Sequence, residues 1–270
     1  MASGGMFRKW RITFLLLLLV FVAANSWLSK LRATDWDRSL WVVAYPINGD
    51  RSAASAAYIN GLRADPAQEA FVDIEEFMMR EAGRYQLKLD KPVRVRLGPV
   101  VDDLPPRPPR NGDMLAVMWW SLQMRYWAFM ADAYDGPAPD IRMFVVYHDP
   151  ATHDVLDHSF GLEKGLIGVV NAFASEKLSG PNNVVIAHEL LHTVGATDKY
   201  DVSTNFPVYP DGYAEPQQQP RFPQKKAEIM GGRVPLSEQE LAMPSSLRDV
   251  VIGEKTAHEI NWIRSDTRSE

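Results

Sequence analysis

Two histidines and a glutamate stand at a spacing that suits metal-assisted hydrolysis. His188, Glu189 and His192 form the pattern H-E-x-x-H, which extends through Gly195 to Asp198 as H-E-x-x-H-x-x-G-x-x-D. Residues four apart share one face of a helix, so both imidazoles can bind one metal ion. The carboxylate of Glu189 can reach a water on that metal. Two ligands, a general base and an open coordination position are the minimum for zinc-dependent hydrolysis.

The residues around the motif predict a buried helix that ends just after His192. Residues 179–181, Ser-Gly-Pro, are typical of a helix start. The apolar run 184–187 predicts burial on nearly all sides. Gly195 can end a helix in the left-handed conformation at low cost, which would let the chain turn back and bring Asp198 to the metal. The alternative is a buried helix with two incidental histidines.

The extended motif resembles that of the metzincin clan of zinc peptidases. Most metzincins have a histidine at the position of Asp198, and an aspartate there is similar to the snapalysin type and to the immune-inhibitor-A type of secreted peptidase. The resemblance implies that His188, His192 and Asp198 bind zinc. It also implies that Glu189 activates a zinc-bound water as the general base.

The resemblance covers residues from about 181 to 232. It implies a methionine-containing turn below the metal, for which Met230 and the two glycines after it are the candidates; the alternative is a methionine that fills a gap in the core. Tyr200 is similar to a tyrosine of the family. Tyr200 and Tyr213 are both candidates for donating a hydrogen bond to the oxyanion of the reaction.

Other carboxylates are alternatives to Asp198 as the third ligand. Asp201 is the nearest, and it would otherwise orient a ligand through a hydrogen bond. In the gluzincin peptidases the third ligand is a later glutamate, although Gly195 favours the short return to Asp198. The downstream glutamates are Glu215, Glu228, Glu238, Glu240 and Glu254.

The composition predicts a globular protein that does not bind nucleic acid. The 270 residues are 46% hydrophobic, and the net charge is 29 − 34 = −5. No strongly basic block lies outside the N-terminus, so nothing indicates nucleic-acid binding. The absence of cysteine excludes disulfides and thiolate metal sites. The expected partner is a peptide or protein substrate.

The N-terminus predicts export. Arg8, Lys9 and Arg11 precede an uncharged apolar run, residues 12–24. This pattern is typical of a secretory signal or of a short membrane anchor within residues 1–28. We favour the anchor because no clear cleavage site stands out. The protein is then expected outside the cytoplasm, held to the membrane by an N-terminal helix, or secreted or periplasmic if the signal is cleaved.

Periodicity predicts the remaining elements. Residues 166–170 are a candidate for the antiparallel edge strand that borders the metzincin cleft, where a peptide could pair. The apolar residues 114–133 predict a buried helix rather than a second membrane segment, because they include charges; contact with a membrane surface is the minor alternative. The predicted strands are residues 40–47, 93–97, 141–147 and 166–173, the other helices are 65–85, 237–243 and 254–262, and the long loops are 104–110 and 201–227.

Three further histidines recur every five residues after the third predicted strand. His148, His153 and His158 indicate either a second metal site or a solvated loop. The acidic residues among them offer calcium ligands as another alternative. These acidic residues are Asp149, Asp154 and Asp157.

These features predict a single α+β domain over residues 29–264, followed by a polar tail, 265–270. We expect a twisted mixed sheet with helices in an upper part to about residue 195, and a mostly helical lower part after it. The expected function is an exported zinc endopeptidase. The alternatives are a non-catalytic zinc-fold scaffold or binding protein at the membrane, and a hydrolase of another amide such as a cell-wall peptide. An aspartate ligand predicts a neutral to mildly alkaline pH optimum.

Overall fold

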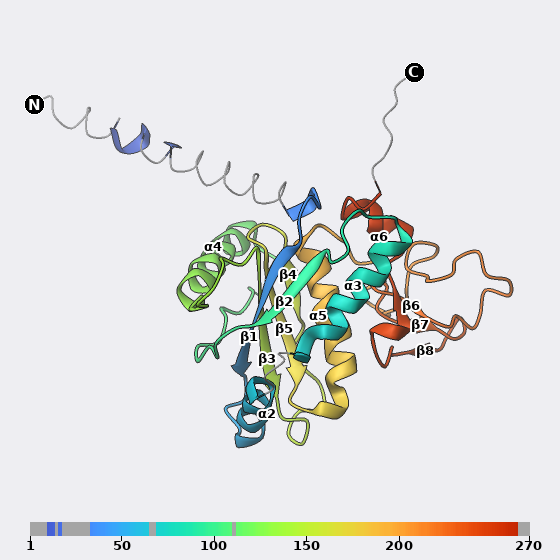
Figure 1. The fold of residues 1–270 in the computed structure, drawn as a ribbon, viewed down its shortest axis with the longest axis horizontal. Coiled ribbons are helices and arrows are strands. Elements are labelled where there is room, and N and C mark those ends of the chain that lie inside the picture. Colours follow the sequence, from blue (N-terminus) through green and yellow to red (C-terminus); the bar gives the residue numbers. More distant parts are fainter. Residues whose placement is uncertain (1–9, 14–15, 18–32, 65–68, 110–111, 264–270) are drawn as a thin grey trace, which may run out of the picture.

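A mixed five-stranded sheet forms the centre of the protein. The computed structural model describes residues 10–13, 16–17, 33–64, 69–109 and 112–263 (Figure 1). The strand order is β2-β1-β3-β5-β4, in which β4 is antiparallel to its neighbour and the other strands are parallel. The strands are β1 (Leu40–Asn48), β2 (Val93–Leu97), β3 (Ile141–His148), β4 (Phe160–Leu162) and β5 (Ile167–Phe173). The expected α+β class with a mixed sheet is thus confirmed.

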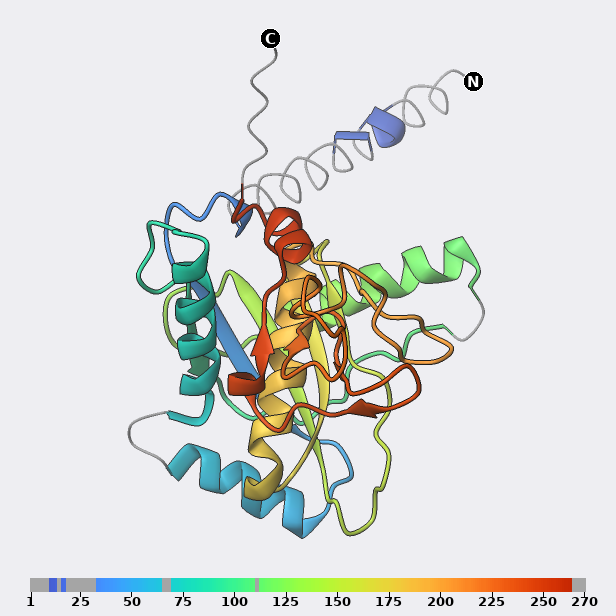
Figure 2. The same ribbon diagram turned by 90° about the vertical axis from the view of Figure 1, so that its right-hand side faces the viewer.

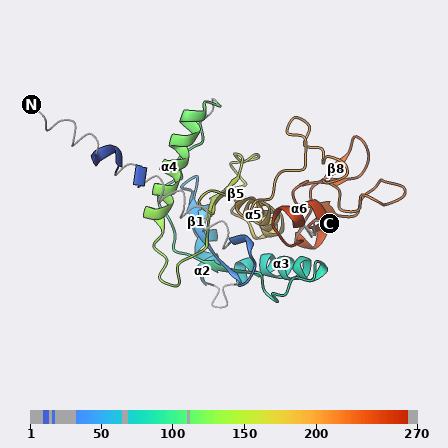
Figure 3. The ribbon, with the colours of Figure 1, turned by 90° about the horizontal axis from the view of Figure 1, so that it is seen from above.

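Helices cover both faces of this sheet (Figure 3). The helices α2 (Ala53–Ala64), α3 (Val72–Arg84) and α5 (Ser179–Thr193) lie on one face, and α4 (Met114–Ala131) lies on the other. Alternate residues of a strand point to opposite faces. Accordingly, Val42 of β1 belongs to the core below α3 and α5, whereas Val43 belongs to the smaller core below α4.

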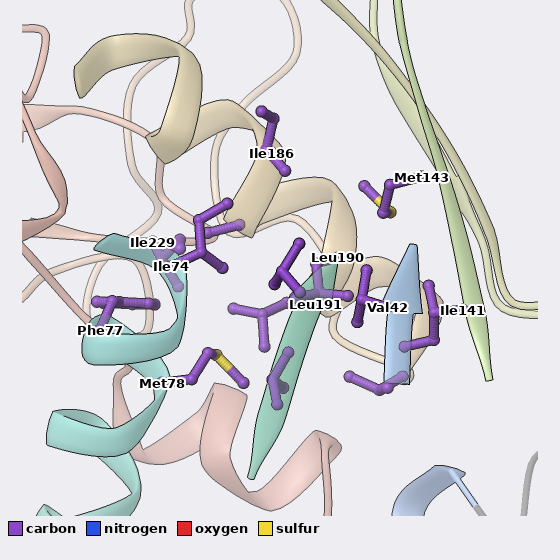
Figure 4. Packing of buried hydrophobic residues seen from close by; sticks show 14 of the residues in the cluster. Val42, Ile74, Phe77, Met78, Ile141, Met143, Ile186, Leu190, Leu191 and Ile229 are labelled. Carbon is purple, nitrogen blue, oxygen red and sulfur yellow. The ribbon is translucent and has the colours of Figure 1, made fainter. Parts of the chain in front are cut away.

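The larger core fixes the orientation of α5. Ile74, Phe77 and Met78 of α3 lie near Leu190 and Leu191 of α5, and all five side chains are buried (Figure 4). Burial of each such side chain stabilises the fold by roughly 1.5–3 kcal/mol. Because one side of α5 packs in this core, its other side faces the C-terminal part of the chain.

The four strands predicted from periodicity are confirmed to within one residue at each end. The predicted helix at 65–85 is shorter than expected: residues 65–68 lie outside the described part, and α3 begins at Val72 after the 3-10 turn η1 (Glu69–Phe71). The helix α2 was not predicted.

The edge strand is β4 and not the segment predicted. Residues 166–170 fall largely in β5, which pairs with β3 on one side and with β4 on the other. Gly165 and Leu166 both adopt positive φ and reverse the chain between β4 and β5. The sequence did not reveal β4 because a strand of three residues is too short for a clear alternating pattern.

The helix α4 is not buried, contrary to the prediction. Only Trp120, Met124 and Ala128 are buried along it. Met114 and Phe129 are 75% and 71% exposed. Among the described helices, α4 lies alone on its face of the sheet, so only its sheet-facing stripe is covered (Figure 3). The sequence of α4 is apolar around the whole helix, so it could not show that only one stripe of the helix is covered.

The C-terminal part is mostly irregular, and the expectation of a mostly helical lower part was wrong. It contains two short sheets, β6 (Ala227–Glu228) with β9 (Val250–Val251) and β7 (Val234–Pro235) with β8 (Leu241–Ala242). The helix α6 (Glu254–Glu259) lies within the predicted range 254–262. Figure 2 shows these segments lying over α5.

The helix predicted at residues 237–243 does not form. The hydroxyl of Ser237 accepts hydrogen bonds from the backbone N–H groups of Gln239 and Glu240, at 3.2 and 3.0 Å. A serine side chain that bonds nearby backbone stabilises a turn at the expense of a helix. This turn leads the chain into β8.

The expected membrane anchor also requires correction. In the part of the chain that the structure describes, no helix has both the length and the apolar character needed to cross a bilayer. This finding overturns the transmembrane assignment and the localisation based on it. Most of the candidate segment, residues 1–28, lies outside the described residues.

Candidate metal centre

The helix α5 brings His188 and His192 to one place. It begins at Ser179 and ends at Thr193, as the sequence predicted. Gly195 then adopts a φ of +106°, and its N–H donates to the carbonyl of His192 at 3.2 Å. The left-handed conformation reverses the chain after the helix. The reversal carries Asp198 back to the two histidines.

Three ligand atoms converge where the chain returns. The Nε2 atoms of His188 and His192 are 3.1 Å apart, and Oδ1 of Asp198 lies 3.2 and 3.1 Å from them respectively. In a tetrahedral zinc site with metal–ligand distances of about 2.0–2.2 Å, neighbouring ligand atoms are about 3.3–3.6 Å apart. The triangle is therefore close to the size that a zinc ion requires.

Backbone carbonyls leave both Nε2 atoms free to bind a metal. Nδ1 of His188 is 2.9 Å from the carbonyl oxygen of Ile229, and Nδ1 of His192 is 2.8 Å from that of Ala196. A carbonyl only accepts, so each Nδ1 carries the proton that it donates. The neutral rings then present lone pairs at Nε2. This is how ligating histidines are commonly oriented.

Protons would compete with a metal for the atoms of this triangle. Burial lowers the pKa of His188, but its hydrogen bond to Asp198, the charge of Glu189 and the Ile229 carbonyl raise it more, so the pKa is raised overall. Burial raises the pKa of Asp198, yet hydrogen bonds from His188 and His192 hold it well below its usual range. A metal ion would replace the proton on His188, so we expect metal binding to release protons.

Glu189 lies beside the triangle with an unused oxygen. The residue is 6% exposed, and its Oε2 is buried without a hydrogen-bond partner among the described residues. Burial raises the pKa of this carboxyl, which the neighbouring His188 and His192 partly oppose. A buried carboxylate oxygen is costly unless it has a polar partner. A water beside the triangle would supply that partner, so the residues present fit a metal site with a bound water.

The loop that carries Asp198 is anchored by Glu259 of α6. The carboxylate of Glu259 accepts hydrogen bonds from N–H and Oγ1 of Thr197, at 2.9 and 2.8 Å, and from Nζ of Lys199 at 2.7 Å. Lys199 is 5% exposed. Sequence reasoning missed this anchor because Glu259 lies about sixty residues beyond the motif.

The turn at Met230 lies directly against His188. The carbonyl that fixes His188 belongs to Ile229, and the carbonyl of Met230 accepts from the N–H of Lys199 at 2.9 Å. Met230 is fully buried, and the N–H groups of Gly231 and Gly232 close the turn onto Glu228. This turn therefore supports both the first histidine and the loop of the third ligand.

The rival carboxylates do not reach the centre. In the described part of the chain, Asp198 supplies the carboxylate that meets the two imidazoles. Glu228 is buried, with its oxygens accepting from Thr256, Gly253 and Gly231. Asp201, expected as a ligand or as support for one, caps the turn at Ser203 and Thr204. The glutamates at 215, 238, 240 and 254 are also outside the group.

The two candidate tyrosines differ in position. The ring of Tyr200 lies 6.5 Å from that of His188, and burial together with the charges of Asp198 and Glu189 raises its pKa. The phenol therefore stays protonated and able to donate a hydrogen bond. The ring of Tyr213 packs against Tyr209 and Phe222, in the loop after the candidate ligands.

Two features near the centre were not predicted. Burial lowers the pKa of Arg233, which interacts electrostatically with Tyr200 and so places a cation near the site. On the sheet side, a Cβ at Gly161 would collide with the carbonyl of Glu189 and with His192. Glycine is thus required for the edge strand β4 to approach α5.

Comparisons with known proteins do not identify the chain. No protein-family model matches it, and no curated protein matches it. Wild-type OgpA from Akkermansia muciniphila is similar with a TM-score of 0.34 and 13% identity, over 81% of this chain and 58% of that one. A chaperone–substrate complex gives a TM-score of 0.36 and 12% identity, over 83% and 33%. The chain spans less than two thirds of both, and likenesses this weak carry no argument about function.

Proposed function

We propose that this protein is a zinc-dependent peptidase whose centre consists of His188, His192, Asp198 and Glu189. The observation that carries the proposal is the convergence of two imidazole nitrogens and one carboxylate oxygen within 3.2 Å of one another. Without a cation these three atoms would repel one another or have to share protons. A zinc ion explains the arrangement, and two imidazoles with one carboxylate are a known ligand set of catalytic zinc.

When bound, zinc would polarise the scissile carbonyl and make an attacking water more acidic. Oε2 of Glu189 is free to take a proton from that water. The same carboxyl then donates the proton to the leaving amine nitrogen, and its raised pKa favours this second role. The phenol of Tyr200 is the candidate donor to the oxyanion.

A metzincin-like classification rests on the sequence motif and agrees with the surroundings of the site. The antiparallel edge strand β4 lies next to α5, and the turn at Met230 abuts His188. An edge strand can bind an extended peptide by adding to the sheet. We therefore propose an extended peptide or protein segment as the substrate.

Substitution Glu189→Gln tests the catalytic role. It should lower kcat/KM on an internally quenched peptide library by roughly 10²–10⁴-fold, because it removes the general base. Zinc content should not change, since Glu189 is not a ligand. The matched control is Glu176→Gln, the same change at an exposed residue just before α5, which should leave both quantities unaltered.

Three results would argue against this function. Full turnover by Glu189→Gln would remove the mechanism. A wild-type protein that binds zinc in the triangle but cleaves no peptide in the library would favour a scaffold with a retained metal site. Cleavage of another amide without peptide cleavage would keep the mechanism and change the substrate.

A further inference from the structure

A second group of metal-binding side chains lies away from the proposed active site. It consists of Asp50, His148 and His153, each with a ligand atom within 4.8 Å of the others. The rings of His148 and His153 have centroids 5.2 Å apart, and Oδ2 of Asp50 is 3.8 Å from Nδ1 of His153. The sequence left open whether these histidines form a second metal site or a solvated loop, and it did not predict the carboxylate, which comes from about a hundred residues earlier.

The hydrogen bonds of Asn171 define the protonation of His148. The side-chain amide of Asn171 donates from Nδ2 to the carbonyl of His158 at 3.2 Å, so its Oδ1 must be an acceptor. Nε2 of His148 lies 3.1 Å from that Oδ1 and therefore carries the donated proton. In the neutral ring, the other nitrogen, Nδ1, then carries a lone pair and no proton. It is buried without a hydrogen-bond partner in the described residues.

An unpartnered buried nitrogen on a histidine that is grouped with a carboxylate needs an explanation. A buried polar atom without a partner costs about 1–3 kcal/mol. The carboxylate of Asp50 is held by N–H groups of Asp149 and Ser52, at 2.6 and 2.9 Å. Gly49 allows the close approach, because a Cβ there would lie 2.6 Å from Cε1 of His148. The fold thus brings together an imidazole and a carboxylate whose orientations are both set by hydrogen bonds.

We propose that Asp50, His148 and His153 form a second metal site, for a divalent transition ion of the zinc type. Two imidazoles and one carboxylate favour zinc over calcium, which prefers oxygen ligands. The acidic residues expected as calcium ligands, Asp149, Asp154 and Asp157, are outside the group. His158 is also outside it.

This second site is separate from the proposed active site. His148 pairs with Phe173 at the end of β5, whereas Gly161, which contacts His192, pairs with Gly168 near its beginning. Five residues of strand correspond to about 16 Å. The ion would tie together the turn after β1, the end of β3 and the connection from β3 to β4. Its role is therefore structural, at the end of the sheet opposite to the catalytic centre.

Zinc stoichiometry of the full chain and its variants tests the proposal. The proteins are freed of metal with a chelator, equilibrated with zinc and measured by elemental mass spectrometry. We expect two zinc ions in the wild type, one in His153→Ala and one in His192→Ala. His158→Ala, a histidine of the same loop outside the group, is the matched control and should retain two. Circular dichroism confirms that each variant is folded.

The outcomes separate the two metal sites. One ion in the wild type that survives in His153→Ala but not in His192→Ala would overturn the second site and leave the proposed function intact. One ion lost in His153→Ala but kept in His192→Ala would support the second site and contradict the first. Asp50→Asn keeps the side-chain shape and should also lose one ion. Calcium binding that is insensitive to His153→Ala, with no second zinc, would overturn the imidazole assignment.

Discussion

At the scale of single residues, the proposed catalytic centre depends on backbone carbonyls that set the state of each histidine. The carbonyls of Ile229 and Ala196 accept hydrogen bonds from the Nδ1 atoms, which leaves the Nε2 atoms of His188 and His192 as candidate ligands. The fixed orientation means that little entropy is lost when a metal binds. Asp198 lacks such rigidity of its own, because its side chain is 39% exposed and sits on a loop.

Glu259 should therefore matter for the centre although it is not a ligand. Substitution Glu259→Gln removes the charge that pairs with Lys199 and loosens the segment carrying Asp198. We expect the free energy of unfolding at pH 7 to fall by about 1 kcal/mol, and zinc affinity to fall by roughly 10-fold. Urea denaturation and a competing chelator measure these changes. Glu254→Gln, an exposed position in the same helix, should change neither; an equal loss there would disprove the specific role.

The ionisation of Glu259 predicts a pH dependence of the free energy of unfolding. Burial raises the pKa of Glu259, but its hydrogen bonds from Lys199 and Thr197 outweigh this, so the folded pKa is lowered. A lowered pKa stabilises the fold above the unfolded value of about 4.3, and the stabilisation is lost as the pH falls through the folded pKa. Unfolding free energies measured from pH 7 down to pH 3 should fall less in Glu259→Gln than in the wild type. Parallel pH profiles would contradict the assignment.

The residues of the motif could be found from the sequence, whereas the residues that hold them in position could not. His188, Glu189, His192 and Asp198 lie within eleven positions, and helix geometry with one glycine brings them together. The supporting contacts come from Ile229, more than thirty residues away, and from α6. Such contacts depend on the tertiary fold, and no local sequence pattern predicts them.

At the scale of elements, the turn after α5 decides whether the third ligand reaches the others. Gly195 has a φ of +106°, which residues with a Cβ rarely adopt. The pattern of apolar residues predicted α5 and four strands, because these elements have regular periods. It did not predict the exposure of α4, the edge position of β4 or the turn at Ser237, since these depend on neighbours elsewhere in the chain or on single side-chain hydrogen bonds.

Substitution Gly195→Ala tests the importance of this turn. The left-handed conformation should cost about 1–2 kcal/mol of unfolding free energy, and zinc affinity should fall because the return of Asp198 is strained. The control is Gly83→Ala in α3, where an added Cβ meets nothing within 4 Å. There the change should stabilise the protein by about 0.5–1 kcal/mol. Thermal and urea unfolding measure both variants. Equal effects at the two positions would show that the conformation of Gly195 is unimportant.

At the scale of the whole molecule, two candidate metal groups lie at opposite ends of one sheet. The His188 centre lies where α5 meets β4 and the irregular C-terminal part, and the Asp50 group lies where β1 and β3 end. The α+β class was predicted from the strands and helices expected in the sequence together with the resemblance of the motif. The irregular character of the C-terminal part did not, because short turns and two-residue strands have no periodic pattern.

The most direct test of the central claim is the zinc affinity of Asp198→Asn, measured in a His153→Ala background so that only the His188 centre is observed. The matched control is Asp201→Asn, three residues away, where asparagine can still cap the local turn. We predict that Asp198→Asn weakens zinc binding by about tenfold or more and that Asp201→Asn leaves it unchanged. Wild-type affinity in Asp198→Asn, or no zinc binding by the background protein itself, would contradict the proposed centre.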